Sequence, residues 1–259
     1  MDLRGKTVLV TGAAGTGVGA GVCQAVVAAG GRLVVNDLTA EGTEAARHAH
    51  GAVAGFAADV SSEAEVEAMF AGIAAAVGRL DGVVNNAGVG LDRGVVDTTA
   101  DDYRRIESTD LRGTWLVSRA FARQAVAGGG GSIVNVSSVH AVATMRGYAL
   151  YAAAKAGVEG FTRGLAAELG SFGVRCNAIA PGYVHSAQNE ALIAGWTDDP
   201  AGWVRAHVQE QQALPVEVEP LDCGWAAVFF LSDASRAVTG QVLRVDAGLT
   251  TLLYDKAFK

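Results

Sequence analysis

The sequence predicts one α/β domain built on a doubly wound parallel sheet with helices on both faces. Short apolar segments alternate along the chain with longer segments of helical periodicity, as in sheets with right-handed crossovers. Polar residues and glycines directly follow the apolar segments, as at the carboxyl ends of parallel strands. No linker is long or polar enough to separate two domains, so we expect a single domain over residues 1–259.

Composition excludes several classes of function. Half of the residues are hydrophobic, which is enough for a large core, and a formal net charge of −7 argues against nucleic acid or an anionic membrane as partner. No apolar stretch approaches the roughly 18 residues of a membrane span, and the first residues lack the apolar region of a signal peptide. Cys23, Cys176 and Cys223 fit neither a disulfide framework nor a metal site. We therefore expect a cytoplasmic protein with reduced thiols and no metal.

The first strand, predicted at 7–10, leads through a glycine-rich loop at 11–19 into a helix at 20–29. Glycines let the backbone approach a pyrophosphate closely, and the free N–H groups at the helix start attract it. This arrangement predicts a dinucleotide site, with an ordinary tight turn as the alternative.

The second strand, predicted at 32–35, ends at Asn36 and Asp37, where the adenosine ribose of a dinucleotide would lie. A carboxylate can accept hydrogen bonds from both ribose hydroxyls and repels the additional phosphate of NADP. No lysine or arginine adjoins Asp37 to offset that repulsion. We therefore expect NAD as the cofactor, with a structural role for Asp37 at the start of a turn as the alternative.

Two further strands, predicted at 53–57 and 82–84, bring more polar residues to the same edge. Asp59 and Val60 follow the first, and the run Asn-Asn-Ala-Gly at 85–88 follows the second. Ser62 to Glu65 is a predicted capping box that opens a helix to about residue 77. Thr99 is expected to cap the next helix, which carries Asp110 and ends near the glycines at 128–131.

The segment 132–155 carries the predicted chemistry. Residues 132–136 have the pattern of a buried strand, which places Ser137 and Ser138 at its carboxyl end. Tyr151 and Lys155 share one face of the following helix, and Lys155 is the only lysine far from a terminus. A hydroxyl, a phenol and an ammonium can thus converge. The alternatives are a surface pair for the tyrosine and lysine and a backbone cap for Ser137.

The last third completes the sheet and covers the site. A sixth strand at 174–179 stops at Pro181 and Gly182, a helix follows at 221–231, and a seventh strand lies at 241–245. Residues 186–219 have helical spacing without a strand, and we interpret them as a lid over the site. A mostly apolar substrate pocket, or ordinary packing, is expected for His140, Met145, Tyr148, Trp196 and Trp203.

In their order and spacing, these motifs resemble the classical short-chain dehydrogenase/reductase family over nearly the whole chain. The resemblance implies a Rossmann-type, seven-stranded parallel sheet, an oxidoreductase acting on CH–OH groups, and a homotetramer or dimer. It assigns the pyrophosphate to Gly12, Gly17, Val18 and Gly19, the adenosine ribose to Asp37, the adenine to Asp59 and Val60, and the ribose region to Asn86, Ala87 and Gly88. It assigns the nicotinamide ribose to Tyr151 and Lys155, and the nicotinamide carboxamide to Val184 and Ser186 after Pro181 and Gly182.

Two departures from the family pattern concern the site. Four residues, where the family has three, separate Gly12 from Gly17, so the glycine loop is one residue longer. Asp110 stands where the family commonly has an asparagine that helps to hold a water in a proton relay with the lysine. An aspartate keeps the acceptors but loses the amide donor. It is harmless if the main chain holds the water; if it pairs with Lys155, it raises the lysine pKa and competes for the ammonium.

The expected reaction is hydride transfer between a secondary alcohol and NAD, with Tyr151 as general base or acid. A free phenol is a poor base at neutral pH, but an ammonium about 4 Å away stabilises its anion by about 4 kcal/mol at an effective dielectric constant of 20. Ser138 would hydrogen-bond the substrate oxygen. We expect a small-molecule substrate such as a cyclic alcohol, a sugar or a steroid-like compound.

Two other functions compete with this reading. The first is a 3-oxoacyl thioester reductase, which would favour NADPH and basic docking patches that the sequence lacks. The second is a dinucleotide-binding regulatory protein with impaired catalysis, which Asp110 and the long glycine loop support. The intact set of Ser138, Tyr151 and Lys155 opposes it.

Overall fold

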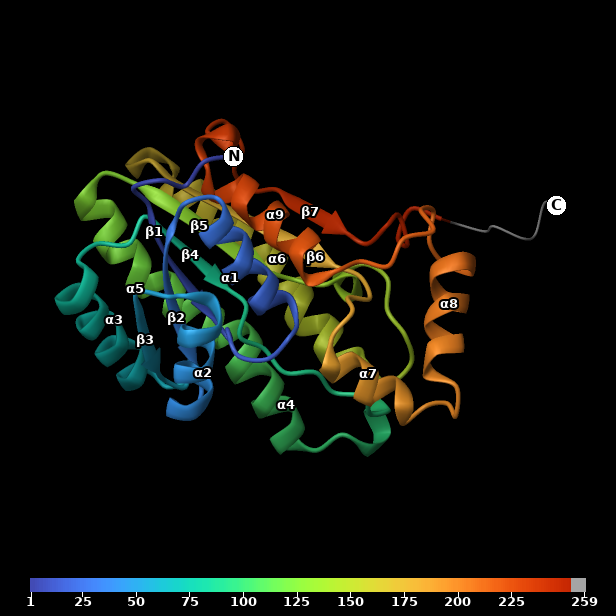
Figure 1. Ribbon diagram of the computed structural model, residues 1–259. Coiled ribbons are helices and arrows are strands. Elements are labelled where there is room, and N and C mark those ends of the chain that lie inside the picture. The colour runs from blue at the N-terminus through green and yellow to red at the C-terminus, as the bar shows by residue number, and fades with distance from the viewer. Residues whose placement is uncertain (253–259) are drawn as a thin grey trace.

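A computed structural model describes residues 1–252 and confirms the predicted sheet (Figure 1). All seven strands are parallel, in the order β3-β2-β1-β4-β5-β6-β7. The order reverses between β1 and β4, and ligands of such sheets bind at the carboxyl ends beside that point. The last seven residues of the predicted domain lie outside the described residues. The strands are β1 (Thr7–Thr11), β2 (Arg32–Asp37), β3 (Ala54–Ala57), β4 (Gly82–Asn85), β5 (Gly131–Val136), β6 (Val174–Pro181) and β7 (Val242–Val245).

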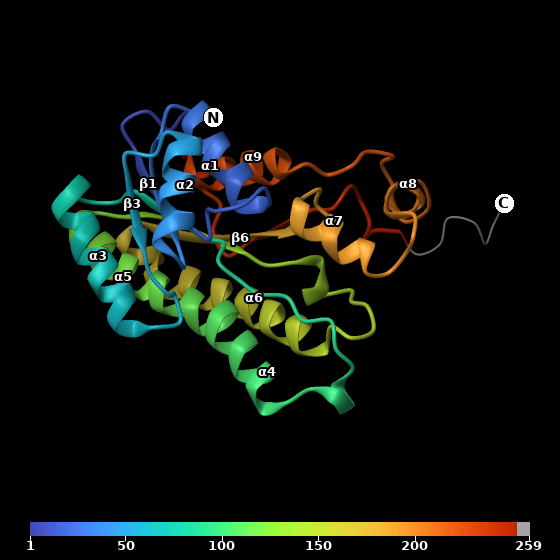
Figure 2. The same ribbon diagram turned by 60° about the horizontal axis from the view of Figure 1, so that its bottom comes forward.

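Helices cover both faces of the sheet (Figures 1 and 2). Strand side chains alternate between the faces, so Val8 and Val10 pack into one core cluster and Leu9 into the other. One layer holds α1 (Val18–Ala28), α2 (Ala40–His50) and α9 (Pro220–Leu231), and the other holds α3 (Glu63–Val77), α5 (Gly113–Gly128) and α6 (Ala149–Leu169). Short 3₁₀ helices are η1 (Val95–Asp97), η3 (Val139–Ala141), η4 (Gly170–Phe172) and η5 (Asp233–Ser235).

The helix predicted to carry Asp110 is interrupted by a wider turn. It begins as α4 (Ala100–Ile106), continues as a π-helical turn (Glu107–Arg112) and ends as α5. Thr99 caps α4 as expected, in a reciprocal capping box with Asp102. Asp110 lies in the π-helical turn and is fully buried. Such turns frequently occur at functional sites.

The capping box predicted at Ser62 and Glu65 is only half present. The Ser62 hydroxyl accepts a hydrogen bond from the Glu65 N–H at 3.4 Å, as expected. The Ser62 N–H, however, donates to the Asp59 carbonyl oxygen at 3.0 Å, so it does not need the glutamate. The Glu65 carboxylate therefore accepts from the Asp59 N–H at 2.9 Å and fixes the turn after β3.

The predicted lid consists of two helices beyond the carboxyl ends of the strands. They are α7 (Ala187–Ala194) and α8 (Pro200–Glu210), which project from the sheet in Figure 1. A parallel bridge between Val184 and Val218 joins the two ends of this insertion. The lid is thereby anchored where it leaves β6 and where it returns to α9.

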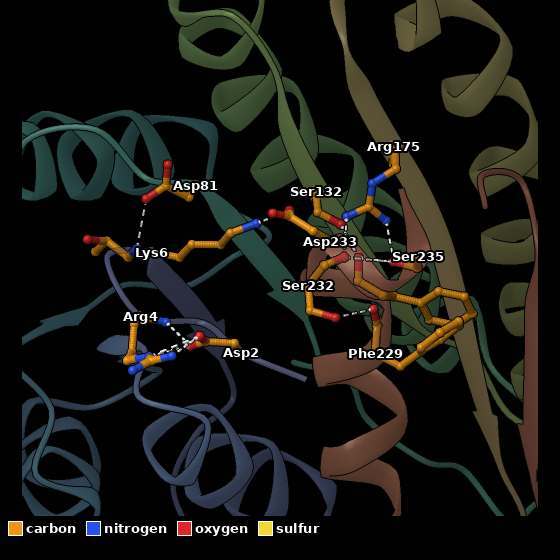
Figure 3. Close-up of polar contacts among 12 residues, drawn as sticks. Asp2, Arg4, Lys6, Asp81, Ser132, Arg175, Phe229, Ser232, Asp233 and Ser235 are labelled. Atoms are coloured by element: carbon orange, nitrogen blue, oxygen red, sulfur yellow. Dashed lines mark hydrogen bonds and ion pairs between the residues drawn. The ribbon is translucent and has the colours of Figure 1, made fainter. Parts of the chain in front are cut away.

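Polar contacts fasten the opposite edge of the sheet (Figure 3). Lys6 Nζ lies 2.5 Å from Asp233 Oδ1 and links the start of β1 to η5. The Arg175 guanidinium donates to Ser235 Oγ at 2.7 Å and to the Ser232 carbonyl oxygen at 3.2 Å. These contacts bind β6 to the end of α9, which leaves the long loops at the carboxyl edge free to form a site.

The three cysteines are free and buried, as expected, and burial raises the pKa of each thiol to about 12. Within residues 1–252, no helix is long and apolar enough to cross a membrane.

Candidate active site

A cavity of about 1580 Å³ runs along the carboxyl edge of the sheet. Single small-molecule sites measure roughly 300–1,000 Å³, so this one has room for a dinucleotide and a substrate together. Every residue that the sequence assigned to catalysis or cofactor binding lines the cavity. The structure therefore brings the sequence-predicted residues together in one cavity, while the role of each residue stays a prediction. No cluster of three or more His, Cys, Asp or Glu side chains in the described part of the chain could hold a metal ion.

The glycine loop forms a cradle that side chains would fill. Gly12 has a φ of +63°, and a Cβ on it would lie 2.8 Å from the Ala87 Cα. A Cβ on Gly19 would overlap the Gly12 carbonyl oxygen and the Asn86 amide. No side chain caps the start of α1 at Gly17, and its first turn holds no acidic residue. The backbone N–H groups at that helix start therefore suit a pyrophosphate, and the residues present fit a dinucleotide.

The glycine loop contacts the predicted lid. Thr16 Oγ1 accepts a hydrogen bond from the Ala187 N–H at 3.0 Å, at the first residue of α7. The Ser186 hydroxyl accepts from Asn189 N–H at 3.2 Å and caps the same helix. Thr16 of the glycine loop and Ser186 of the predicted lid thus both accept hydrogen bonds from the first turn of α7.

Asp37 lies at the end of β2 and is held in place by two backbone groups. Its Oδ2 accepts from the Ala14 N–H and its Oδ1 from the Leu38 N–H, both at 2.8 Å. The turn-forming role and a ribose-binding role are therefore compatible. The lysine and arginine among the lining residues are Lys155 and Arg105, on α6 and α4, so neither comes from the end of β2.

Ser138, Tyr151 and Lys155 all line the cavity, and His140, two residues after Ser138, lies against the Tyr151 ring. Tyr151 and Lys155 stand one turn apart on α6, with Lys155 Nζ 5.5 Å from the centroid of the Tyr151 ring. Ser138 Oγ accepts from the His140 N–H at 3.3 Å, which leaves its proton available. Ser137 Oγ instead donates to the Lys155 carbonyl oxygen at 3.2 Å and approaches Glu159 Oε1 at 3.1 Å. This confirms the structural alternative for Ser137.

Asp110 forms a buried ion pair with Lys155. Its Oδ2 lies 3.1 Å from Lys155 Nζ, which also donates to the Val136 carbonyl oxygen at 3.1 Å. The other carboxylate oxygen accepts from the Val89 N–H at 2.8 Å. Burial lowers the pKa of Lys155, but the charge of Asp110 and then that of Tyr151 outweigh it, so the pKa of Lys155 is raised. Of the two outcomes considered for Asp110, the structure shows the pairing with Lys155.

Aromatic side chains line the cavity around Tyr151. His140 stacks on Tyr148 with ring centroids 4.7 Å apart, and its edge contact with Tyr151 is at 5.5 Å. Burial lowers the pKa of His140, which favours the neutral imidazole. Met145, Trp196 and Trp203 also line the cavity.

Sequence reasoning missed two residues of this wall, Tyr183 and His207. Tyr183 directly follows Gly182 at the end of β6, and His207 lies one helical turn after Trp203 on α8. The position after Pro181-Gly182 and the helical spacing from Trp203 are the signals that could have identified them.

Comparisons with known proteins agree with this geometry. A family profile described as enoyl-(acyl carrier protein) reductase matches residues 12–250. D-threitol dehydrogenase of Mycolicibacterium smegmatis is 37% identical over 254 residues, which cover 96% of this chain and 94% of that protein. The 2,5-dichloro-2,5-cyclohexadiene-1,4-diol dehydrogenase of Sphingobium indicum is 34% identical over 256 residues, with 97% and 99% covered.

Solved structures are similar over the same length. A short-chain type dehydrogenase/reductase from Mycobacterium ulcerans has a TM-score of 0.88 at 31% identity, with 97% of this chain and 92% of that chain covered. A gluconate 5-dehydrogenase from Burkholderia cenocepacia, in complex with NADP and tartrate, has a TM-score of 0.88 at 32% identity, with 97% and 98% covered.

Proposed function

The chain belongs to the short-chain dehydrogenase/reductase family, and we propose that it is an NAD-dependent enzyme that interconverts a secondary alcohol and a ketone by hydride transfer. The family's oxidoreductase chemistry on CH–OH groups is common to the named dehydrogenase relatives. The observation that carries the proposal is that Ser138, Tyr151 and Lys155 line the same cavity as the glycine cradle. The substrate class that we propose is a cyclic alcohol, a sugar or a steroid-like compound.

Asp37 supports NAD over NADP. A related gluconate 5-dehydrogenase structure holds NADP, so the choice for this chain depends on its own residues. Two N–H groups fix the Asp37 carboxylate at the end of β2, where we propose that the adenosine ribose binds. A phosphate on the ribose would approach this negative charge. Arg105 and Lys155, the arginine and lysine that line the cavity, do not come from the end of β2 and so are not placed to offset the repulsion there.

Each residue of the catalytic group has a distinct part in the reaction. When bound, NAD would supply the hydride acceptor beside the substrate carbon. Tyr151 takes the hydroxyl proton during oxidation and returns it during reduction. The ammonium of Lys155, 5.5 Å from the Tyr151 ring centroid, stabilises a phenolate there by about 3 kcal/mol at an effective dielectric constant of 20. Ser138 donates its hydroxyl proton to the substrate oxygen and positions it.

The two competing functions have less support. A thioester reductase that uses NADPH would need a positive charge where Asp37 lies. A purely regulatory dinucleotide-binding protein does not require Ser138, Tyr151 and Lys155 to meet in one cavity. We also propose that the protein is cytoplasmic and assembles as a homotetramer or dimer. Sedimentation of the purified protein tests the assembly.

The decisive variant is Tyr151→Phe. It removes one oxygen from the proposed base, so turnover of a panel of secondary alcohols should fall by about 10²–10⁴-fold while NAD affinity is retained. NADH absorbance reports turnover, and calorimetric titration reports NAD binding. Tyr103→Phe, at a half-exposed position on α4, is the matched control and should behave as the wild type. Near-normal turnover by Tyr151→Phe would refute the role of Tyr151 as the general base or acid.

A further inference from the structure

A cluster of rings from three segments forms the lid side of the cavity. Trp203 and His207 stack on α8 with centroids 5.1 Å apart and an interplanar angle of 8°. Tyr183, from the end of β6, meets both rings edge-on at 5.8 and 5.6 Å. Trp196 packs against Trp203 at 5.7 Å, and its Nε1 donates to Asp92 Oδ2 at 3.3 Å. The lid is therefore tied both to the end of β6 and to the loop that follows β4.

Two polar atoms of this cluster are buried without a partner. Tyr183 Oη and His207 Nε2 are closed to solvent, and neither has a hydrogen-bond partner among the described residues. Both residues line the cavity, and their ring centroids are 5.6 Å apart. A buried polar atom that stays unpaired destabilises the fold, and in the wall of a cavity a bound ligand or water can complete its bonding.

The charges around the two atoms indicate what that ligand group is. Burial, and then the charges of Glu217, Glu190 and Glu219, raise the pKa of Tyr183, so the phenol keeps a proton to donate. Burial lowers the pKa of His207, so its imidazole is neutral and Nε2 either donates or accepts. The charges of Glu217 and Glu190 are partly offset by His185, which lies 2.7 and 3.0 Å from them, and the charge that remains disfavours an anionic ligand near Tyr183. A neutral hydroxyl group, which both donates and accepts, matches the pair.

We propose that Tyr183 and His207 form a second polar subsite, which binds a substrate hydroxyl other than the one oxidised at Tyr151. The substrate is then a diol or polyol that spans the cavity from α6 to α8. Because both atoms are closed to solvent, the rings of α8 must shift to admit the hydroxyl, which makes the lid part of substrate recognition. This inference rests on the proposed function and narrows its substrate class; a steroid-like compound with one hydroxyl would leave both atoms unpaired.

The test compares compounds that differ by one polar group. Cyclohexanol, the 1,2-, 1,3- and 1,4-cyclohexanediols, 4-aminocyclohexanol and 4-hydroxycyclohexanecarboxylate are titrated calorimetrically into the NADH-loaded protein, and turnover with NAD is measured separately. At least one diol should bind about tenfold more tightly than cyclohexanol. Tyr183→Phe removes Oη, and His207→Phe replaces the imidazole and its two nitrogens by a phenyl ring, so an aromatic ring remains at each position. Each variant should abolish most of that preference and leave cyclohexanol binding unchanged. Tyr103→Phe and His48→Phe, at exposed positions, are the matched controls and should keep the preference.

The outcomes separate this inference from the function on which it rests. Binding without any preference for a diol, or a preference that survives both variants, overturns the subsite whether or not the protein turns the compounds over. Tightest binding of the amino alcohol or the hydroxy acid overturns the assignment to a neutral hydroxyl. A diol preference that both variants abolish supports the subsite even without turnover, in which case the proposed oxidoreductase function fails instead. Turnover of cyclohexanol and the diols with equal KM supports the function and overturns the subsite.

Discussion

Replacing Asp110 by asparagine tests how this site controls its base. Lys155 Nζ lies 3.1 Å from Asp110 Oδ2 and 5.5 Å from the Tyr151 ring centroid. At an effective dielectric constant of 20, the ammonium stabilises a phenolate at that centroid by about 3 kcal/mol. The distance from the Asp110 carboxylate to the Tyr151 ring centroid is at most about 8.6 Å, the sum of these two distances. The carboxylate therefore repels a phenolate at the centroid by at least about 2 kcal/mol. The pair together favours the phenolate by only about 1 kcal/mol.

Asp110→Asn removes that repulsion, so the active form should persist to lower pH. A gain of about 2 kcal/mol corresponds to a shift of about 1.5 pH units in the acidic limb of the kcat profile. The alkaline limb should also move down, because the pKa of Lys155 loses the charge that raises it against burial. The profile as a whole therefore moves toward acid.

The same substitution should destabilise the fold. A raised lysine pKa contributes stability that is present below the unfolded value of about 10.4 and is lost as pH rises through the folded value. Breaking a buried ion pair costs about 3–5 kcal/mol, and the asparagine oxygen reduces this cost by still accepting from the Val89 N–H. Differential scanning fluorimetry measures the fall in Tm, and kcat is measured across the pH range with NAD and a diol. Asp101→Asn, on the exposed side of α4, is the control. A kcat profile that does not move would refute the electrostatic argument.

Three further predictions concern the cofactor end and the lid. Asp37→Ser combined with Leu38→Arg replaces a repulsive charge by an attractive one, so the ratio of kcat/KM for NADP to that for NAD should rise by about tenfold or more. An unchanged ratio would mean that other residues distinguish NAD from NADP. Gly19→Ala should weaken NAD binding and destabilise the protein by about 1–3 kcal/mol, because the new methyl group overlaps the loop backbone, whereas Gly164→Ala, in open space on α6, should be neutral or stabilising. Equal Tm values for the two variants would contradict the close packing of the glycine loop. Thr16→Ala should remove about 1 kcal/mol from the cap of α7, seen as faster proteolysis within the lid, and Thr16→Ser should restore the cap; equal cleavage of both variants would exclude this contact as a lid anchor.

The strands and the site edge could be predicted because local patterns determine them. Apolar runs of the right length define the strands, and a glycine such as Gly12 is needed wherever the backbone approaches a ligand or takes a positive φ. Tyr151 and Lys155 were recognisable because helical spacing alone puts them on one face.

The features that escaped prediction depend on contacts between distant segments. The partner of Glu65 was wrong because the turn before the helix had already used the Ser62 N–H. The bond from Ala187 to Thr16 joins residues 171 positions apart, and the pairing of Tyr183 with His207 exists only after the lid folds back. The π-helical turn was invisible because one additional residue hardly disturbs the apolar period of a long helix.

Because of that π-helical turn, the number of residues between α4 and α5 decides whether the Asp110 carboxylate faces Lys155. A π-helical turn accommodates one residue more than the α-helical turn it replaces, so deleting one residue between Glu107 and Arg112 would restore a regular helix. Everything on its amino-terminal side would then rotate by about 100° relative to α5, while the core face of α5 stayed in place. If the deleted residue is Leu111 or Arg112, Asp110 lies on the rotated side and would move away from Lys155 without any change in its own side chain. Libraries of substitutions never sample this change, whereas deletion scanning across six positions would.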